Sequence, residues 1–314
     1  MLRLAMTTDA ETFERVRGPL ADRGIAVDHV QAKERALRVS AGDDSAGEGP
    51  ADEHSVDDDP ADDADADGEF AGFDAGFVYP SRLMEGAVVD ARLSVPWVND
   101  REAVLTSRNK AGVLAALDDA GLPTPRTTLV SNPVDEAVVA EAVEPFSYPV
   151  VVKPNSATRG VGVATATDLD SLLGVVDYLN LVHDYRATGD KSYLIQEFLP
   201  DARDYRAMVV DGAFVGAVER RLPADAVEEG RWKHNVHRGA EATGIDLPGR
   251  ARELAERTAA VLGIDYLGVD LLEADGRLVV NETNARPTVD AAAKYEPDFY
   301  DRLAALIERT AARE

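Results

Sequence analysis

The chain has 314 residues, enough for two or three modest domains, and its 45% apolar content is typical of a globular protein. It contains no cysteine, which excludes disulfides, thiolate metal sites and a cysteine nucleophile, and it has no run of about 18 apolar residues that would predict a membrane-spanning helix. The formal net charge of -25 argues against nucleic-acid binding, which requires a basic face.

The first hundred residues are expected to form a small α/β domain. Residues 2–6 and 25–30 are predicted strands on either side of a helix at residues 10–23. The apolar start is too short for a signal peptide, so we expect a cytoplasmic protein.

Residues 41–69 have a different composition. No lysine or arginine occurs between Arg38 and Arg82, and residues 57–67 are almost entirely aspartate and alanine. Such a segment cannot bury apolar surface and repels itself, so we predict a disordered acidic insertion at 41–69. A cation-binding role is the weaker alternative, because the segment lacks the spacing of a calcium loop.

Acidic residues are also spread along the rest of the chain, which contains only six lysines. An acidic surface of this kind repels itself at low ionic strength and becomes tolerable when salt screens the charges. The composition is therefore typical of a protein from a salt-rich cytoplasm, although an ordinary acidic protein is an alternative.

Ordered structure is expected to resume after the insertion. Residues 73–79 and 95–99 are predicted strands, and a helix is predicted over 106–121, ending at Gly121. Strands and helices then alternate to the end of the chain, which predicts an α/β fold.

The first segment suited to chemistry is 149–164. A β-branched run ends at Lys153, and a loop containing Gly160 and Gly162 leads into a second apolar run. The spacing fits neither a dinucleotide-binding fingerprint nor a Walker A loop. A glycine loop between two strands can lay backbone N–H groups over phosphates while the lysine reaches them, but a plain hairpin fits equally well.

Residues 194–198 form the next predicted strand, which ends at Pro200. Such a strand can hold an adenine through backbone hydrogen bonds, with Glu197 reaching the ring amine or the ribose. A core strand without a ligand is the alternative.

A hairpin follows, with Asp211-Gly212 as its predicted two-residue turn. This turn pairs Val210 with Ala213 and places Asp204 opposite Glu219. Because side chains alternate along a strand, we expect one face to carry two acids and two arginines: Asp204, Arg206, Glu219 and Arg221. That face suits a nucleotide and an anionic intermediate, and a solvated outer face is the alternative.

Residues 231–239 concentrate donors for anions in a chain that is poor in lysine. The donors are Arg231, Lys233, His234, Asn235 and Arg238. A basic surface loop is the alternative interpretation.

The last hairpin, 266–287, has a polar residue inside each apolar strand. A three-residue loop at 275–277 would set Asp270 opposite Glu282, whereas a two-residue turn would oppose it to Asn281. Glu282 and Asn284 share a face in either case. Carboxylate and amide oxygens that converge in this way favour a Mg²⁺ site that also binds ATP phosphates. Acids that face water are the alternative.

These segments, in this order, resemble the RimK family of ATP-grasp glutamate ligases over nearly the whole length outside 41–69. The resemblance lies in Phe73-Asp-Ala-Gly-Phe-Val-Tyr-Pro, Asn109-Lys110, Gln196-Glu197-Phe198, Glu219-Arg220-Arg221, Asn235-x-His237-Arg238-Gly239, Gly268-Val-Asp270 and Glu282-x-Asn284. It implies an α/β ATP-grasp fold, in which two α+β subdomains clamp ATP, preceded by an N-terminal α/β pre-ATP-grasp domain. The expected divisions are 1–100, 101–190 and 191–314.

The resemblance also implies roles for single residues. One set would hold ATP: Lys110, Lys153, Gly160, Gly162, Glu197, Phe198, Asp204 and Lys233. A second set would bind the substrate and the acyl phosphate: Arg206, Arg221, Asn235, Arg238 and Arg286. A third set would ligate one or two Mg²⁺ ions, or Mn²⁺: Asp270, Glu282 and Asn284. Arg286 stands where the family has a Ser-Pro-Gly ending, so it could pair with an acceptor carboxylate.

The implied activity is ATP-dependent carboxylate–amine ligation through an acyl phosphate. Glutamate or a similar amino acid is the expected amine, and a small molecule, a coenzyme or a protein C-terminus is the expected acceptor. Relatives suggest a homodimer or homotetramer, and no membrane partner is expected. A kinase on the same scaffold and a non-catalytic nucleotide-binding regulator are the alternatives, but the intact Lys153, Asp270, Glu282 and Asn284 argue against the regulator.

Overall fold

The computed structural model describes residues 1–37, 39, 68–158, 160–182, 190–234, 236 and 239–313. Nearly all of the predicted insertion at 41–69 lies outside the described residues, as do two predicted site residues, Asn235 and Arg238. Within the described ranges, no helix has the length and apolar character needed to cross a membrane.

The N-terminal domain is built on a parallel sheet with the order β2-β1-β3. Its strands are β1 (Leu2–Met6), β2 (Ile25–His29) and β3 (Ala75–Phe77), and its helices are α1 (Glu11–Ala21) and α2 (Leu83–Leu93). The predicted strand at 95–99 is reduced to a single bridge between Trp97 and Gly76. Gly76 permits this contact, because a Cβ there would lie 2.4 Å from the Trp97 ring.

The predicted helix at 106–121 is two helices, α3 (Arg101–Arg108) and α4 (Lys110–Asp119). The break falls at Asn109, whose ψ of 84° is not helical and whose side-chain oxygen accepts a hydrogen bond from the backbone N–H of Gly112. An asparagine that caps the following turn ends one helix and starts the next. The break places Lys110 at the first position of α4.

The central unit is an antiparallel four-stranded sheet with the order β4-β7-β5-β6. Its strands are β4 (Thr127–Val130), β5 (Val150–Pro154), β6 (Ala164–Ala166) and β7 (Tyr193–Glu197). Helices α5 (Glu136–Val143) and α6 (Leu169–Val182) pack on one face of the sheet through a shared apolar core. β7 lies in this sheet although it follows the boundary expected at residue 190.

The C-terminal unit is an antiparallel five-stranded sheet with the order β10-β9-β8-β11-β12. Its strands are β8 (Arg203–Val210), β9 (Ala213–Arg221), β10 (Glu241–Gly244), β11 (Tyr266–Ala274) and β12 (Arg277–Asn284). Its helices are α7 (Ala224–Glu228), α8 (Gly249–Leu262), the short η2 (Ala292–Lys294) and α9 (Phe299–Ala311).

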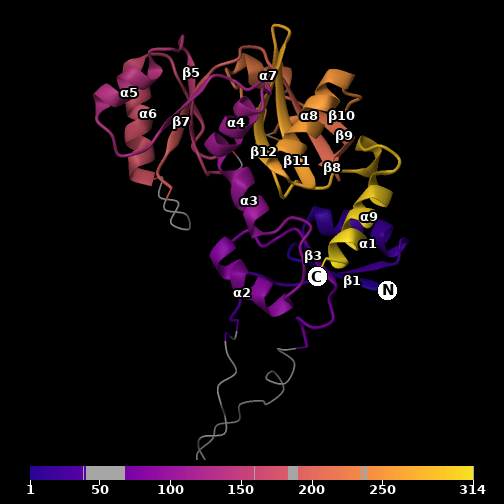
Figure 1. Cartoon of the computed structure of the whole chain (residues 1–314). Coiled ribbons are helices and arrows are strands. Elements are labelled where there is room, and N and C mark those ends of the chain that lie inside the picture. The colour runs from indigo at the N-terminus through magenta and orange to yellow at the C-terminus, as the bar shows by residue number, and fades with distance from the viewer. Residues whose placement is uncertain are drawn as a thin grey trace, which may run out of the picture.

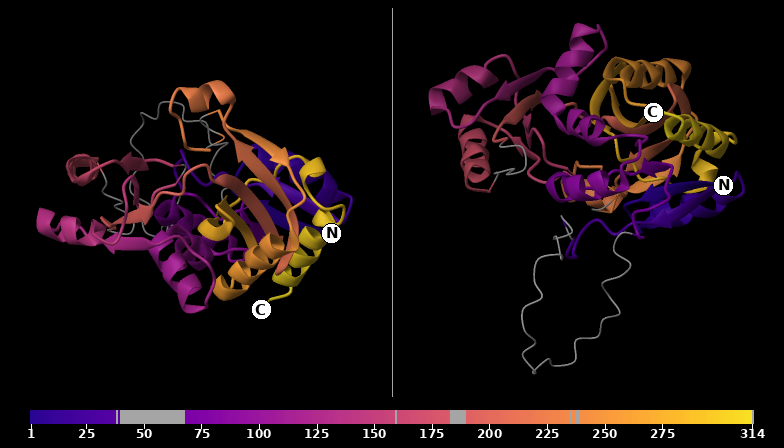
Figure 2. Two further views of the ribbon diagram at one scale, coloured as in Figure 1. Left: turned by 90° about the horizontal axis from the view of Figure 1, so that it is seen from above. Right: turned by 60° about the horizontal axis from the view of Figure 1, so that its bottom comes forward.

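Two apolar cores hold the sheets in place. One joins α8 and α4 to the five-stranded sheet, and the other joins α9 and the N-terminal sheet to one end of β8 and β11. Figure 1 shows the four-stranded and five-stranded units side by side, with α4 between them, and Figure 2 keeps them as separate lobes in both views. The two sheets meet where Lys153 of β5 bonds to Asn281 of β12.

Candidate functional site

The β11–β12 hairpin brings two acids face to face. Asp275 (φ 50°) and Gly276 (φ 78°) form a two-residue turn, and Ala274 pairs with Arg277. This turn was expected to oppose Asp270 to Asn281. A β-bulge next to Asp270 shifts the register instead, so that Asp270 pairs with Glu282 and Asn281 becomes the extra residue. The pairing predicted for a three-residue loop is therefore reached with a two-residue turn.

A second bulge changes the β8–β9 hairpin. The predicted turn and the pairing of Val210 with Ala213 are confirmed, but the register shifts at Met208, and Asp204 lies opposite Arg220. The prediction that Asp204 lies opposite Glu219 was wrong. The shift coincides with Gly216, where a Cβ would approach the carbonyl oxygen of Lys294 to 2.6 Å, so close packing against the η2 segment accompanies the bulge.

The bulge moves two predicted residues to the other face. Arg221 Nη2 lies 2.7 Å from Glu219 Oε2, and Arg203 Nε lies 2.9 Å from Glu219 Oε1. The Arg221 side chain is 69% exposed. The structure therefore does not bring Arg221 or Glu219 to Asp204, and Arg220 takes the expected place of Arg221.

A buried charge network joins β8, β9 and β11. Arg206 binds both carboxylate oxygens of Asp270, at 2.7 and 2.8 Å. Arg220 lies 2.5 Å from Asp204 Oδ1 and 3.0 Å from Asp270 Oδ2, and it is only 12% exposed. Two acids and two arginines thus neutralise one another, with His234 Nδ1 lying 3.8 Å from Asp204 Oδ2.

The two acids of this network titrate differently. Burial raises the pKa of Asp204 to about 6, and the Asp270 charge adds to this while Arg220 opposes it. Burial also acts to raise the pKa of Asp270, but the charges of Arg206 and Arg220 outweigh it and hold that pKa well below its usual range. Asp270 is therefore a permanent carboxylate at neutral pH.

Two buried lysines, Lys153 and Lys110, contact neighbouring residues of β12. Lys153, on β5, donates from Nζ to Gln196 Oε1 at 2.9 Å and to Asn281 Oδ1 at 3.2 Å. Lys110 Nζ lies 3.2 Å from Glu282 Oε1. Burial lowers the pKa of Lys153 to about 8, although the Glu282 charge opposes the shift. Lys153 of the four-stranded sheet and Lys110 of α4 thus both lie close to the predicted cation ligands of the five-stranded sheet.

The donor set has the oxygen chemistry of a hard-cation site, but in this structure Asp270 is bonded to Arg206 and Arg220, and Glu282 is paired with Lys110. Arg206, Asp270 and Glu282 form a cross-strand row, and Asn284 follows on the same face of β12. The Oδ1 atom of Asn284 accepts a hydrogen bond from the backbone N–H of Arg286, which fixes the amide. Across the described part of the chain, no three His, Asp or Glu side chains gather at one point, so an ion here would take two carboxylates and an amide oxygen.

Glu197 is tied to both sheets. It accepts from the backbone N–H of Arg126 at 2.9 Å and from Arg277 Nη2 at 2.8 Å. Burial acts to raise its pKa, but Arg277 and Arg126 outweigh it, so the net shift is downward. Phe198 meets the edge of the Trp232 ring, with centroids 5.7 Å apart. The predicted adenine-binding pair therefore lies between the β11–β12 turn and the basic loop.

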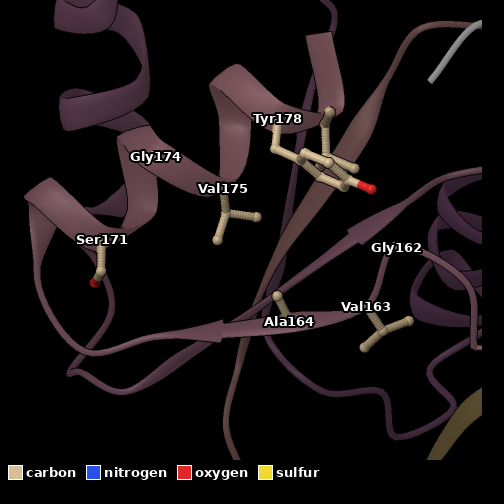
Figure 3. A pocket seen from close by; sticks show the side chains of 8 residues that line it. Gly162, Val163, Ala164, Ser171, Gly174, Val175 and Tyr178 are labelled. Carbon is tan, nitrogen blue, oxygen red and sulfur yellow. The ribbon is translucent and has the colours of Figure 1, made fainter. Parts of the chain in front are cut away.

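The glycine loop is held by that basic loop. Gly160 and Gly162 have φ of 67° and 74°, and a Cβ on Gly162 would lie 2.7 Å from Pro154 Cγ. Lys233 Nζ donates to the carbonyl oxygen of Val163. A hollow of about 330 Å³ lies between the end of this loop and α6. Figure 3 shows the residues that line it, which come from the loop and the start of β6 (Gly162, Val163 and Ala164) and from α6. This hollow contains none of the predicted charged site residues.

Known proteins resemble this chain in both sequence and fold. The profile of the RimK-like ATP-grasp domain matches residues 107–305. A probable alpha-L-glutamate ligase of Citrobacter koseri is 31% identical over 220 residues, which cover 69% of each chain. A ribosomal protein bS6--L-glutamate ligase of Escherichia coli is 30% identical over 220 residues, again 69% of each chain.

Three solved structures show the same fold. The ATP-grasp ligase PsnB, complexed with a minimal precursor, has a TM-score of 0.66 at 19% identity and covers 98% of both chains. A D-alanine--D-alanine ligase of Bacillus anthracis complexed with ATP has a TM-score of 0.63 at 15% identity, covering 100% of this chain and 98% of its own. A RimK domain protein of Sphaerobacter thermophilus has a TM-score of 0.62 at 22% identity, covering 99% and 98%.

Proposed function

We propose that this chain, which belongs to the RimK-like ATP-grasp family of ATP-dependent carboxylate–amine ligases, joins glutamate or a similar amino acid to a carboxylate of a protein or peptide. Relatives named for glutamate ligation and for ribosomal protein bS6, and a structural neighbour bound to a precursor peptide, support this substrate class. The relatives do not favour a kinase or a non-catalytic regulator.

One observation carries the proposed site. Lys153 of the four-stranded sheet bonds to Asn281, the residue next to Glu282 in the five-stranded sheet. The proposed phosphate-binding lysine therefore lies next to the proposed ligands of the divalent ion where the two sheets meet, which supports a site for phosphoryl transfer. We also propose that the central subdomain ends after β7, giving divisions at 1–100, 101–197 and 198–314.

In the proposed site, basic side chains bind the phosphates and oxygen ligands bind the metal ion. ATP would supply the phosphoryl group that converts the acceptor carboxylate to an acyl phosphate, and a Mg²⁺ ion bound at the site would supply charge neutralisation of the phosphates. Lys110 and Lys153 hold the phosphates, while Asp270, Glu282 and Asn284 hold the ion. Arg206 and Arg220 keep Asp270 ionised and oriented, and Arg286 lies beside Asn284 at the acceptor end. The amine then attacks the acyl carbon and phosphate leaves.

Hydroxylamine trapping tests this function. The protein is incubated in molar KCl with Mg²⁺, ATP and hydroxylamine, together with a glutamate-ended peptide or free glutamate as the carboxylate. A hydroxamate formed on the peptide, with ADP released in equal amount, is the expected result. ADP release without hydroxamate, when glutamate also fails to become incorporated, would show a kinase or an ATPase instead.

ATP affinity should depend on the protonation of Lys153. Burial lowers its pKa to about 8, so the free protein loses this charge as pH rises above that value. Phosphates bind the protonated amine and raise its pKa, so affinity should fall by up to about tenfold per pH unit above pH 8. Calorimetric titration with Mg·ATP from pH 7 to 10 measures this. The variant Lys153→Arg, which stays charged, should show a flatter profile.

Salt should stabilise the folded chain. We infer from the net charge of -25 that the protein works in a salt-rich cytoplasm. Screening length falls from about 10 Å at 0.1 M salt to about 3 Å at 1 M, which weakens the self-repulsion of the acidic surface. The thermal unfolding midpoint should rise by about 5 °C or more over that range, in KCl and in NaCl alike. A midpoint that falls or stays constant would contradict the inference.

A further inference from the structure

Asn281 stands at the point where the two sheets meet. It is the extra residue of the β12 bulge, between Val280, which pairs with Leu271, and Glu282, which pairs with Asp270. Successive side chains of a regular strand point to opposite faces. Here two successive residues both reach cleft lysines, because Asn281 bonds to Lys153 and Glu282 pairs with Lys110. The bulge is what makes this possible.

The Lys153 amine is held by neutral oxygens. Its hydrogen bonds go to the amide oxygens of Gln196 and Asn281, and Gln196 is itself fixed by donating from Nε2 to Thr127 Oγ1 at 2.8 Å. An amide oxygen orients an ammonium group without cancelling its charge, whereas a carboxylate would form an ion pair. Two of the three N–H groups are thereby used among the described residues, and the third is left for an anion.

The neighbouring acid has another partner. Glu282, which could compete for Lys153, is paired with Lys110 at 3.2 Å. The two lysines therefore have different partners: Lys110 pairs with an acid of the proposed ion site, whereas neutral oxygens hold the Lys153 ammonium group. Among the described residues, Asn281 supplies the only hydrogen bond to Lys153 Nζ that comes from the five-stranded sheet.

We propose that Asn281 is a positioning residue for ATP, which holds the Lys153 ammonium group across the cleft at the phosphate position and leaves its charge available. This inference rests on the proposed function, because it requires that Lys153 binds a phosphate of ATP. Asn281 acts only through Lys153, so its effect must vanish when Lys153 is absent.

A double-mutant cycle tests this dependence, with Mg·ATP affinity measured by calorimetry in molar KCl. The variant Asn281→Leu removes one hydrogen bond to a charged group and should weaken binding about tenfold. Asn281→Asp keeps the size but pairs with the ammonium group, and it should weaken binding more than Asn281→Leu does. In a Lys153→Met background, Asn281→Leu should change affinity less than about twofold.

Each outcome decides one question. The positioning role would be overturned if Asn281→Leu reduced Mg·ATP affinity equally with and without Lys153. It would also be overturned if neither Asn281 variant reduced that affinity. Unchanged affinity in Lys153→Met alone would instead overturn the proposed site. The matched control is Asn180→Leu, on the exposed side of α6, where the amide bonds only Asn132 among the described residues. Thermal unfolding midpoints measured without nucleotide identify any variant that fails to fold. If Asn281→Leu fails to fold, the affinity of Asn281→Asp, which is equal in size to the native residue, is used in its place.

Discussion

Replacing Glu282 by glutamine should lower ATP-dependent hydroxamate formation by about three orders of magnitude. Glutamine keeps the shape but removes a charge from the proposed ion site opposite Asp270, and it leaves Lys110 without its carboxylate partner. A bound metal ion stabilises the phosphoryl transition state by several kcal/mol, and each 1.36 kcal/mol is a factor of about ten in rate. Initial rates at saturating Mg²⁺ and ATP measure the effect.

A second glutamate on the same hairpin provides the control. Glu273 lies on β11 and pairs with the guanidinium groups of Arg250 and Arg203, away from the lysines of the cleft. The variant Glu273→Gln should keep its rate within about threefold, because surface ion pairs contribute little. If Glu282→Gln kept more than a tenth of the rate of the unsubstituted protein, the ion site would have to lie elsewhere.

The sequence predictions are confirmed where they depend on local features such as turns and buried strands. The Asp211-Gly212 and Asp275-Gly276 turns have the positive φ angles that such pairs favour, and both hairpins form around them. Lys153 lies near the end of a fully buried strand, as its β-branched run predicts. Strand identity and turn position depend on neighbours in sequence, so the α/β class and the two hairpins could be predicted from the residues. The approach of Lys153 to Glu282, which lie on different sheets, was expected from the family resemblance.

The faces of the strands could not be predicted in the same way. Each bulge adds one residue to one strand and so reverses every side chain beyond it. The bulge of β9 lies at Gly216, which packs against residues 294 and 295, far along the chain. No local pattern shows that contact. For the same reason the roles of Asn281 and Arg220 were missed, although Arg220 lies inside the quoted Glu219-Arg220-Arg221 motif.

The break between α3 and α4 could have been predicted from the sequence. Asn109 stops α3 and starts α4 because its own side chain caps the new helix. A cap inside a continuous helical pattern can be recognised from sequence, since asparagine is a favoured N-cap. The predicted helix at 106–121 ignored it, and the same asparagine accepts a hydrogen bond from Asn155 at 3.0 Å, next to the glycine loop.

Arg220→Met should destabilise the protein by about 3–5 kcal/mol, whereas Arg221→Met should cost less than about 1 kcal/mol. The two arginines are adjacent, but Arg220 neutralises the buried carboxylates of Asp204 and Asp270, whereas Arg221 is 69% exposed and shares the Glu219 carboxylate with Arg203. Removing Arg220 leaves Asp204 buried without a partner of opposite charge at hydrogen-bonding distance among the described residues. Urea unfolding at pH 7.5 in molar KCl measures both variants.

The pH dependence separates this mechanism from lost packing. Burial already raises the pKa of Asp204 to about 6, and Arg220 opposes that rise, so the pKa should be higher still in Arg220→Met. A carboxyl group whose pKa is higher in the folded than in the unfolded chain gains stability as pH falls below the folded value. The deficit of Arg220→Met should therefore shrink between pH 7.5 and pH 5. A constant deficit would indicate lost packing, and equal deficits in the two variants would mean that the β9 bulge does not set their faces.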